Sequence, residues 1–201
     1  MNLEQVYAAL QRNGFSARIF STGAAAAQAV LQSIPAGASV GIGGSMTVKS
    51  LGLHETLADA GHPVYWHWFA AEEDRAATLA AAAAADVYLA SSNAVSATGE
   101  LVNIDGTGNR VAAQFWGPRR VILLCGRNKI CPDVPAALQR VKAEACPANA
   151  RRLGLSTPCA LTGKCTNCHS PERFCRVTSI LSRPTPGRDI SVWLIDDDLG
   201  Y

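Results

Sequence analysis

The sequence of 201 residues has almost no excess of charge and no long apolar run. Its 18 Lys and Arg residues nearly balance its 16 Asp and Glu residues, so a nucleic-acid-binding surface is not expected. No apolar stretch reaches about 18 residues, the length that indicates a membrane span. The first residues lack a basic segment followed by an apolar one, which argues against a secretory signal and for a cytoplasmic protein. No segment repeats at a fixed period.

What the chain does have is a hydrophobic fraction of 48%, enough for a substantial core. The apolar run at 119–126 is typical of a strand buried on both faces of a sheet, and 191–197 reads as a last strand. Strands that alternate with helices favour an α/β fold with a Rossmann-like, mainly parallel sheet. We expect one domain over 1–201, with a cysteine-bearing loop at 146–190. Other strands are predicted at 15–21, 64–69, 86–95 and 100–105, and helices at 3–13, 22–33, 46–61, 72–84 and 134–145.

Three glycines, Gly41, Gly43 and Gly44, stand between a predicted strand and a predicted helix, and the hydroxyl side chains of Ser45 and Thr47 follow. Glycine lets the backbone approach a ligand closely, and a helix N-terminus presents unpaired N–H groups with partial positive charge. This glycine loop is therefore predicted to bind a phosphate or a carboxylate. Its spacing matches neither the dinucleotide-binding pattern nor the P-loop pattern, and a tight strand-to-helix turn is the structural alternative.

A polar segment at 91–113 follows an apolar strand. In open α/β sheets, ligands lie beyond the carboxyl ends of the strands, where both this segment and the glycine loop are expected. Arg110 is predicted to make a two-pronged contact with an anion, and Lys129, after the strand at 119–125, to complete the site. The alternative is that Asn, Asp and Gly here only build turns. The other ligand-binding candidates of this segment are Asn93, Asn103, Gly106, Thr107, Gly108 and Asn109.

Two carboxylates are candidates for chemistry on a bound ligand. Asp105 lies among the polar residues, where it can accept from a substrate hydroxyl or act as a base. Glu100 follows a Thr-Gly turn and is a weaker candidate for a nucleophile, since such a side chain is usually just solvated. The aromatic run at 64–69 is predicted to be a strand with one packed face, at the core or a subunit interface, without a metal role for His67.

Four of the seven cysteines have the spacing C-x5-C-x2-C-x6-C, at Cys159, Cys165, Cys168 and Cys175. Disulfides are rare in the cytoplasm, so closely spaced cysteines favour metal binding or redox chemistry. Two residues between thiolates let both face one ion, and four thiolates suit tetrahedral zinc or a [4Fe–4S] cluster. Free or redox-paired thiols are the alternative. Cys131 and Cys146 flank the helix at 134–145, about 22 Å apart, so they are not expected to pair with each other.

Several motifs together resemble the LUD-domain family, which is named for lactate utilization and includes proteins similar to lactate utilization protein C. They are GIGGSMT, the segment at 91–113, GRNKI, CPANARRLG, TPCALTGKCTNCHSPERFC and DDLGY, so the resemblance runs from about residue 2 to residue 201. It implies a fold similar to ribose-5-phosphate isomerase, glucosamine-6-phosphate deaminase and the CoA transferases. In those isomerases an acidic residue stands where this chain has Asn93, which argues against a simple isomerase.

The resemblance implies a role in lactate or related organic-acid utilization, with iron–sulfur and flavin oxidase subunits as possible partners. It also favours the [4Fe–4S] cluster over zinc by association. The first hypothesis is thus a redox or accessory subunit that binds a small anionic ligand and carries a four-cysteine metal centre. The second is a stand-alone enzyme acting on a phosphorylated sugar or a CoA thioester, with Asp105 or Glu100 as base or nucleophile. The third is a ligand-sensing subunit without catalysis. A homo-oligomer is possible in each case.

Overall fold

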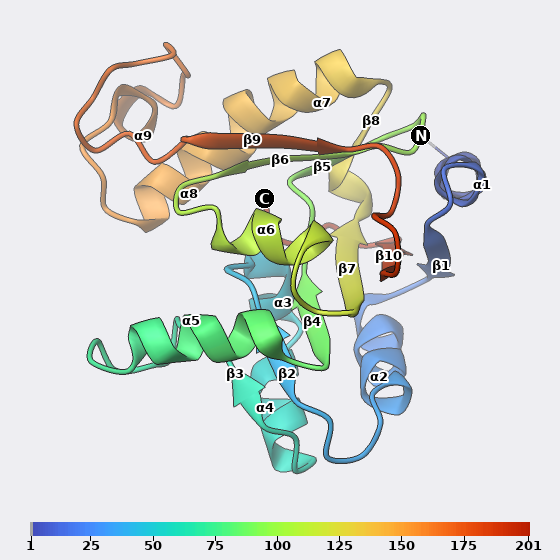
Figure 1. Ribbon diagram of the computed structural model, residues 1–201. Coiled ribbons are helices and arrows are strands. Elements are labelled where there is room, and N and C mark those ends of the chain that lie inside the picture. The colour runs from blue at the N-terminus through green and yellow to red at the C-terminus, as the bar shows by residue number, and fades with distance from the viewer. Residues whose placement is uncertain (1) are drawn as a thin grey trace.

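The computed structural model describes residues 2–201 as an α/β protein whose central sheet has six strands (Figure 1). Its strand order is β1-β10-β7-β4-β2-β3, and all five pairings are parallel, which confirms the predicted Rossmann-like sheet. The strands of this sheet are β1 (Ser16–Phe20), β2 (Val40–Ile42), β3 (Val64–Tyr65), β4 (Val87–Ala90), β7 (Arg120–Gly126) and β10 (Asp189–Ile195).

The helices begin and end largely where local signals place them. Asn2 caps the first helix and Thr22 the second, each through a side-chain oxygen that accepts from a backbone N–H. Gly52, at φ +62°, divides the segment predicted as one helix at 46–61 into two. The helices that precede β7 are α1 (Leu3–Arg12), α2 (Gly23–Ser33), α3 (Met46–Ser50), α4 (Leu53–Asp59), α5 (Arg75–Ala84) and α6 (Asn109–Phe115).

Alternate residues of the central strands enter two apolar cores. Ile122 and Leu124 of β7 pack on one face with α2, α3 and α4, whereas Val121 and Leu123 pack on the other with α1 and α6. All four side chains are fully buried. The continuous apolar run thus serves both faces, as its composition predicts.

A second sheet, which the sequence analysis did not foresee, has the strand order β8-β5-β6-β9. The segment predicted as one strand at 86–95 leaves the central sheet after Ala90, and β5 then pairs antiparallel with β6. In Figure 1 this sheet lies with α7, α8 and α9 at one end of the molecule, away from α4. Its strands are β5 (Ala94–Ser96), β6 (Leu101–Asp105), β8 (Ile130–Cys131) and β9 (Val177–Leu181).

The segment 146–190 is not one loop, contrary to the prediction. The helix that begins after the capping residue Asp133 continues as α7 (Val134–Arg140), a π-helical turn (Val141–Ala145) and α8 (Cys146–Arg152). Pro147 lacks an N–H and its ring crowds the preceding turn, which accounts for the wider π turn rather than a helix end. Helix α9 (Pro158–Thr162) and strand β9 follow within the same segment.

The run at 64–69 also differs from the predicted strand. Only Val64 and Tyr65 pair with β2, and the chain then turns, with the N–H of Phe69 donating to the carbonyl of Trp66. Because of this turn, His67 and Trp68 lie outside the sheet and line the cavity described below. None of the helices in residues 2–201 has the length and apolar character needed to cross a bilayer.

Candidate functional site

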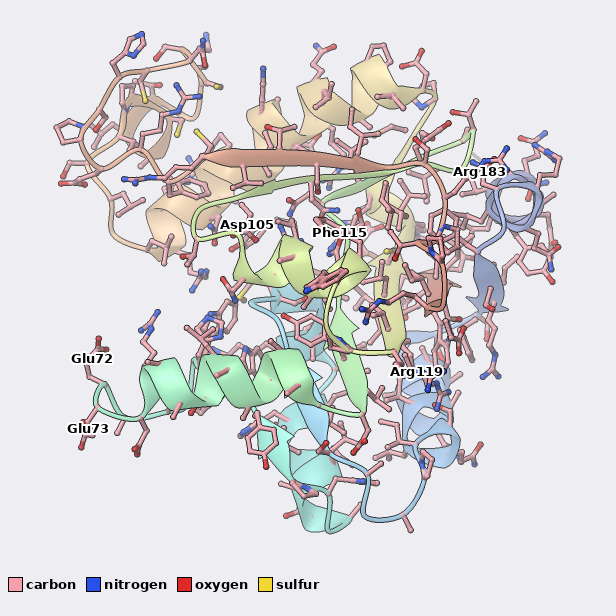
Figure 2. The ribbon with its side chains drawn as sticks, in the orientation of Figure 1. Glu72, Glu73, Asp105, Phe115, Arg119 and Arg183 are labelled. Atoms are coloured by element: carbon pink, nitrogen blue, oxygen red, sulfur yellow. The ribbon has the colours of Figure 1, made fainter. Side chains whose placement is uncertain are left out.

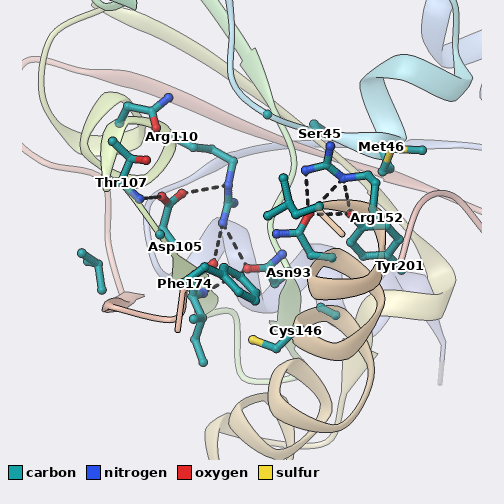
Figure 3. Close-up of a pocket in the computed structure, with 18 of the residues that line it drawn as sticks. Ser45, Met46, Asn93, Asp105, Thr107, Arg110, Cys146, Arg152, Phe174 and Tyr201 are labelled. Atoms are coloured by element: carbon teal, nitrogen blue, oxygen red, sulfur yellow. Dashed lines mark hydrogen bonds and ion pairs between the residues drawn. The ribbon is translucent and has the colours of Figure 1, made fainter. Parts of the chain in front are cut away.

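A cavity of about 870 Å³ opens where the chain crosses from the central sheet into the second sheet. The crossing residues Ser91, Ser92 and Asn93 follow the carboxyl end of β4 and line it. The loop after β2, the turn between β6 and α6, Lys129 after β7, helix α8 and the segment 172–177 form the other walls (Figure 3). The cavity therefore occupies the strand-end position that the sequence analysis predicts for a ligand.

The glycine loop divides between the cavity and the core. Gly44, Ser45 and Thr47 line the cavity, but Gly41 and Gly43 do not. A Cβ on Gly41 would overlap the backbone carbonyl of Ala82, and one on Gly43 would lie 2.7 Å from the Tyr88 hydroxyl. The Ser45 Oγ accepts from the N–H of Val48 as the cap of α3, a helix of only five residues. Close packing against Ala82 and Tyr88, rather than contact with a ligand, thus accounts for Gly41 and Gly43.

Arg110 is the centre of a buried polar network. Its Nη1 donates to the Ser91 carbonyl and to Asn103 Oδ1, at 3.1 and 2.6 Å. Its Nη2 donates to Asn93 Oδ1 and to the Ile104 carbonyl, at 3.1 and 3.0 Å. These four bonds use all four N–H groups of the two terminal nitrogens.

The remaining nitrogen, Arg110 Nε, lies 3.2 Å from Asp105 Oδ2, so all three nitrogens of the guanidinium are engaged (Figure 3). The predicted two-pronged contact with an anion does not agree with this arrangement, because the guanidinium nitrogens of Arg110 already contact residues of the cavity wall. Its positive charge still lies at the cavity, since the side chain is among those that line it.

Asp105 lines the cavity, but its carboxylate is engaged on both oxygens. Oδ1 accepts from the backbone N–H groups of Thr107 and Gly108, at 3.1 and 2.7 Å, and Oδ2 faces Arg110. This is a side-chain-stabilised turn, and it carries the chain from β6 into α6. Figure 2 shows Asp105 between the second sheet and α6.

The asparagines and small residues of the polar segment have different positions. Asn103 is fully buried outside the cavity, where its amide donates to Ser92 Oγ and Gln114 Oε1 and positions the wall. Gly108, at φ +92°, precedes α6 and also lies outside the cavity lining. The candidates from this segment that do reach the cavity, besides Arg110 and Asp105, are Asn93, Gly106, Thr107 and Asn109.

Glu100, the weaker catalytic candidate, lies in the turn between β5 and β6 and not in the cavity lining. Its carboxylate accepts from the hydroxyls of Ser96 and Thr98. Partial burial opposes its charge, but these hydrogen bonds prevail and lower the pKa of Glu100. The side chain thus fixes the turn.

Lys129 is buried, lines the cavity, and makes no ion pair within residues 2–201. Its Nζ donates to Thr47 Oγ1 at 2.7 Å and to Ser91 Oγ at 2.8 Å. Burial lowers the pKa of Lys129 to about 8; Cys125 opposes this shift, while the positive charges of Arg140 and Arg110 add to it. A large share of the amine is therefore neutral near pH 8.

Helix α8 and the end of the chain supply a group of cavity residues that the sequence analysis did not select. Arg152 Nε donates to Asn149 Oδ1 and to the Tyr201 hydroxyl, and its guanidinium lies 4.4 Å from the ring centre of Trp68 (Figure 3). Its Nη1 has no partner in the described part of the chain. From the sequence alone, the NARR motif at 149–152 is explained by a solvated helix face as readily as by an anion site, because nothing local shows that Trp68 and Tyr201 meet it.

His67 also lines the cavity and was assigned to a packed strand face from the sequence. It is 9% exposed, and its Nδ1 has no hydrogen-bond partner among the described residues. Burial lowers the pKa of His67, and Arg75 and Arg152 add to this effect against the opposing Asp105. A neutral imidazole therefore faces the cavity with one unused nitrogen.

Positive charge predominates around the cavity. Six basic side chains line it against two carboxylates, those of Asp105 and Glu172. Two of these cations, Arg110 and Lys129, are buried, where weak solvent screening strengthens their attraction for an anion. The basic side chains are Arg75, Arg110, Lys129, Arg152, Arg173 and Arg176.

The cysteines predicted as metal ligands lie in the segment around α9, where Figure 2 shows several sulfur atoms. Among residues 2–201, no three His, Cys, Asp or Glu side chains converge closely enough to hold one ion, so the present arrangement does not fit a bound tetrahedral zinc. Cys165 is exposed, and the other three are half-buried. Arg173 braces this loop by donating to the carbonyls of Cys168 and Cys175.

A fifth thiol lies near this group. Cys146, at the start of α8, is buried and lines the cavity. Burial raises the pKa of Cys146 to about 12, and Cys175, Cys165 and Cys159 raise it further by their proximity. The cysteine segment thus adjoins the cavity through Cys146.

Comparison with known proteins gives a family and a fold. The family model of the LUD domain matches residues 3–195. Among solved structures, the chain is similar to a DUF162 family protein from Deinococcus radiodurans, at 16% sequence identity and a TM-score of 0.56. The likeness covers 96% of this chain and 95% of that chain, and at such identity it concerns the fold alone. No curated protein matches the chain.

Proposed function

Because the chain belongs to the LUD-domain family, we propose that it serves organic-acid utilization by binding a small organic anion. Lactate or a related 2-hydroxy or 2-oxo acid is the proposed ligand class, and the basic cavity is the proposed site. The observation that carries this proposal is the excess of cationic over acidic side chains around the cavity.

Two of these cations are suited to contact the ligand itself. Arg152 has Nη1 without a partner in the described chain, and Lys129 as an ammonium group has a third N–H beyond its bonds to Thr47 and Ser91. Asn93 and Thr107 add neutral polar groups on the opposite wall, which suit the hydroxyl or carbonyl of such an acid.

The proposed role is that of a redox or accessory subunit rather than a stand-alone enzyme acting on a sugar phosphate or CoA thioester. That alternative requires Asp105 or Glu100 as base or nucleophile. Asp105 is held by two backbone N–H groups and Arg110, and Glu100 lies outside the cavity lining. Partnership with iron–sulfur and flavin subunits is supported by family membership alone.

A metal centre at Cys159, Cys165, Cys168 and Cys175 stays a prediction from spacing. The thiols would have to move together to hold an ion, and the irregular loop that bears them is compatible with such a rearrangement. Iron, acid-labile sulfide and zinc should be measured on protein purified without oxygen. A folded, metal-free protein with reactive thiols would remove the metal centre and leave anion binding untouched.

A thermal-shift panel tests the anion proposal. Lactate, pyruvate and other 2-hydroxy or 2-oxo acids should raise the Tm, because a ligand that binds only the folded state stabilises it. Their neutral amides should not. Stabilisation by sugar phosphates or acyl-CoA alone would instead support the enzyme alternative, and no shift with any anion would refute the proposed site.

A further inference from the structure

The two hydroxyls that hold Lys129 are themselves committed as donors. Thr47 Oγ1 donates to the carbonyl of Leu199 at 3.1 Å, and Ser91 Oγ donates to the carbonyl of Ser92 at 3.2 Å. Each hydroxyl has one proton, so each can only accept from the lysine. Both hydrogen bonds to Nζ therefore use N–H groups of the lysine.

A neutral amine satisfies this arrangement as fully as an ammonium group does. A neutral Nζ has two N–H groups and one lone pair, and Thr47 and Ser91 take both N–H groups. The lone pair is then left without a donor from either hydroxyl. Because Lys129 lines the cavity and has no carboxylate partner in residues 2–201, this lone pair is available to a ligand there.

We infer that Lys129 forms an imine with a carbonyl-bearing anion, of which a 2-oxo acid is the simplest class. This inference rests on the proposed function, since it uses the same basic cavity. A 2-oxo acid carries its carboxylate beside the reacting carbonyl, and the cations that line the same cavity as Lys129 are the proposed partners of that carboxylate.

The bond changes balance without an oxidant or reductant. The lone pair of the neutral amine attacks the carbonyl carbon, a C–N bond forms, and the carbonyl electrons move to oxygen. The resulting carbinolamine loses water, with both amine protons leaving on the former carbonyl oxygen, and nitrogen and carbon become doubly bonded. The reaction reverses when water returns.

The test uses pyruvate with sodium cyanoborohydride, which reduces an imine to a stable secondary amine. Intact mass should show one reduced pyruvate adduct, and peptide mapping should place it on Lys129. The other lysines, Lys49, Lys142 and Lys164, are exposed. A pKa of about 8 against the ordinary 10.5 gives Lys129 about a 300-fold larger neutral fraction near pH 7, so labelling there should predominate.

Lys129→Met should abolish the adduct, and Lys164→Met should leave it unchanged. If Lys129→Met does not fold, peptide mapping of the wild-type protein still shows whether the adduct is on Lys129. Pyruvate that raises the Tm without labelling Lys129 would overturn the imine and leave the anion proposal standing. If pyruvate gives no Tm shift and no label, both the imine and the anion proposal are overturned. Equal labelling of all four lysines would overturn the imine, because it would mean surface reactivity only.

Discussion

The buried pair of Arg110 and Asp105 offers the sharpest prediction from the structure. Arg110→Met keeps much of the side-chain volume but removes the charge and all its donors. Most acceptors retain another partner: Asn93 Oδ1 keeps the N–H of Ile104, and the Ser91 carbonyl keeps Gln114 Nε2. The main cost is therefore the Asp105 carboxylate, 9% exposed, left without its counter-ion.

Breaking such a buried pair by removing one partner costs about 3–5 kcal/mol, against about 5–15 kcal/mol for the whole stability of a typical protein. Urea unfolding followed by circular dichroism should show this loss with an unchanged m value. The control Arg75→Met breaks the exposed pair with Glu72, 3.7 Å long, and should cost less than about 1 kcal/mol.

Asp105→Asn is the second single variant of a double-mutant cycle. It keeps an acceptor for Thr107 and Gly108 but leaves the charge of Arg110 without a counter-ion. The double variant should cost less than the two single variants added together, since neither charge is then left alone. A loss under about 1 kcal/mol for Arg110→Met would refute the reasoning, because it would mean that water reaches the pair.

Two further predictions concern the glycine loop and the buried lysine. Gly41→Ala should lower the free energy of unfolding by about 3 kcal/mol, because its Cβ would overlap the Ala82 carbonyl. The control Gly37→Ala, in open space at φ +75°, should lower it by about 1 kcal/mol through backbone strain alone. Equal losses in urea unfolding would contradict the steric argument. The folded pKa of Lys129, about 8, lies below the unfolded value of 10.5, so between these values only the unfolded chain holds the proton and rising pH favours folding. The free energy of unfolding of the wild type minus that of Lys129→Met should therefore increase from about pH 8 to 10.5, and a flat difference would count against the buried amine.

Local patterns predicted the central sheet and most helix boundaries. The continuous apolar run of β7 and the caps at Asn2 and Thr22 depend on neighbouring residues only, so the sequence displays them. The same motifs indicated the LUD-domain family, which the match over residues 3–195 confirms.

The second sheet was not predictable in this way. The apolar run at 86–95 looks continuous, and nothing local shows that its second half pairs with β6 rather than with the central sheet. The π turn before Pro147 was missed for a related reason: the helix was expected to end at about Ala145, although the chain widens one turn and continues.

The candidate site was predicted in position but not in the role of each residue. Arg110 was expected to bind an anion, but its partners come from the segment 91–105, and only the folded structure shows that they use both terminal nitrogens. Arg152 and His67 were missed because the residues that surround them are distant in sequence. Charge and spacing therefore indicate where polar residues gather at the strand ends, and tertiary contacts decide which of the cations there remain without a partner.

An anion site in this cavity can be measured by titration calorimetry with lactate and with its neutral amide, on the wild type and on Arg152→Met side by side. Lactate should bind the wild type, the amide should not, and Arg152→Met should weaken lactate binding about tenfold, or about 1.4 kcal/mol. Equal binding of acid and amide, or lactate affinity unchanged by Arg152→Met, would contradict an anion site in this cavity.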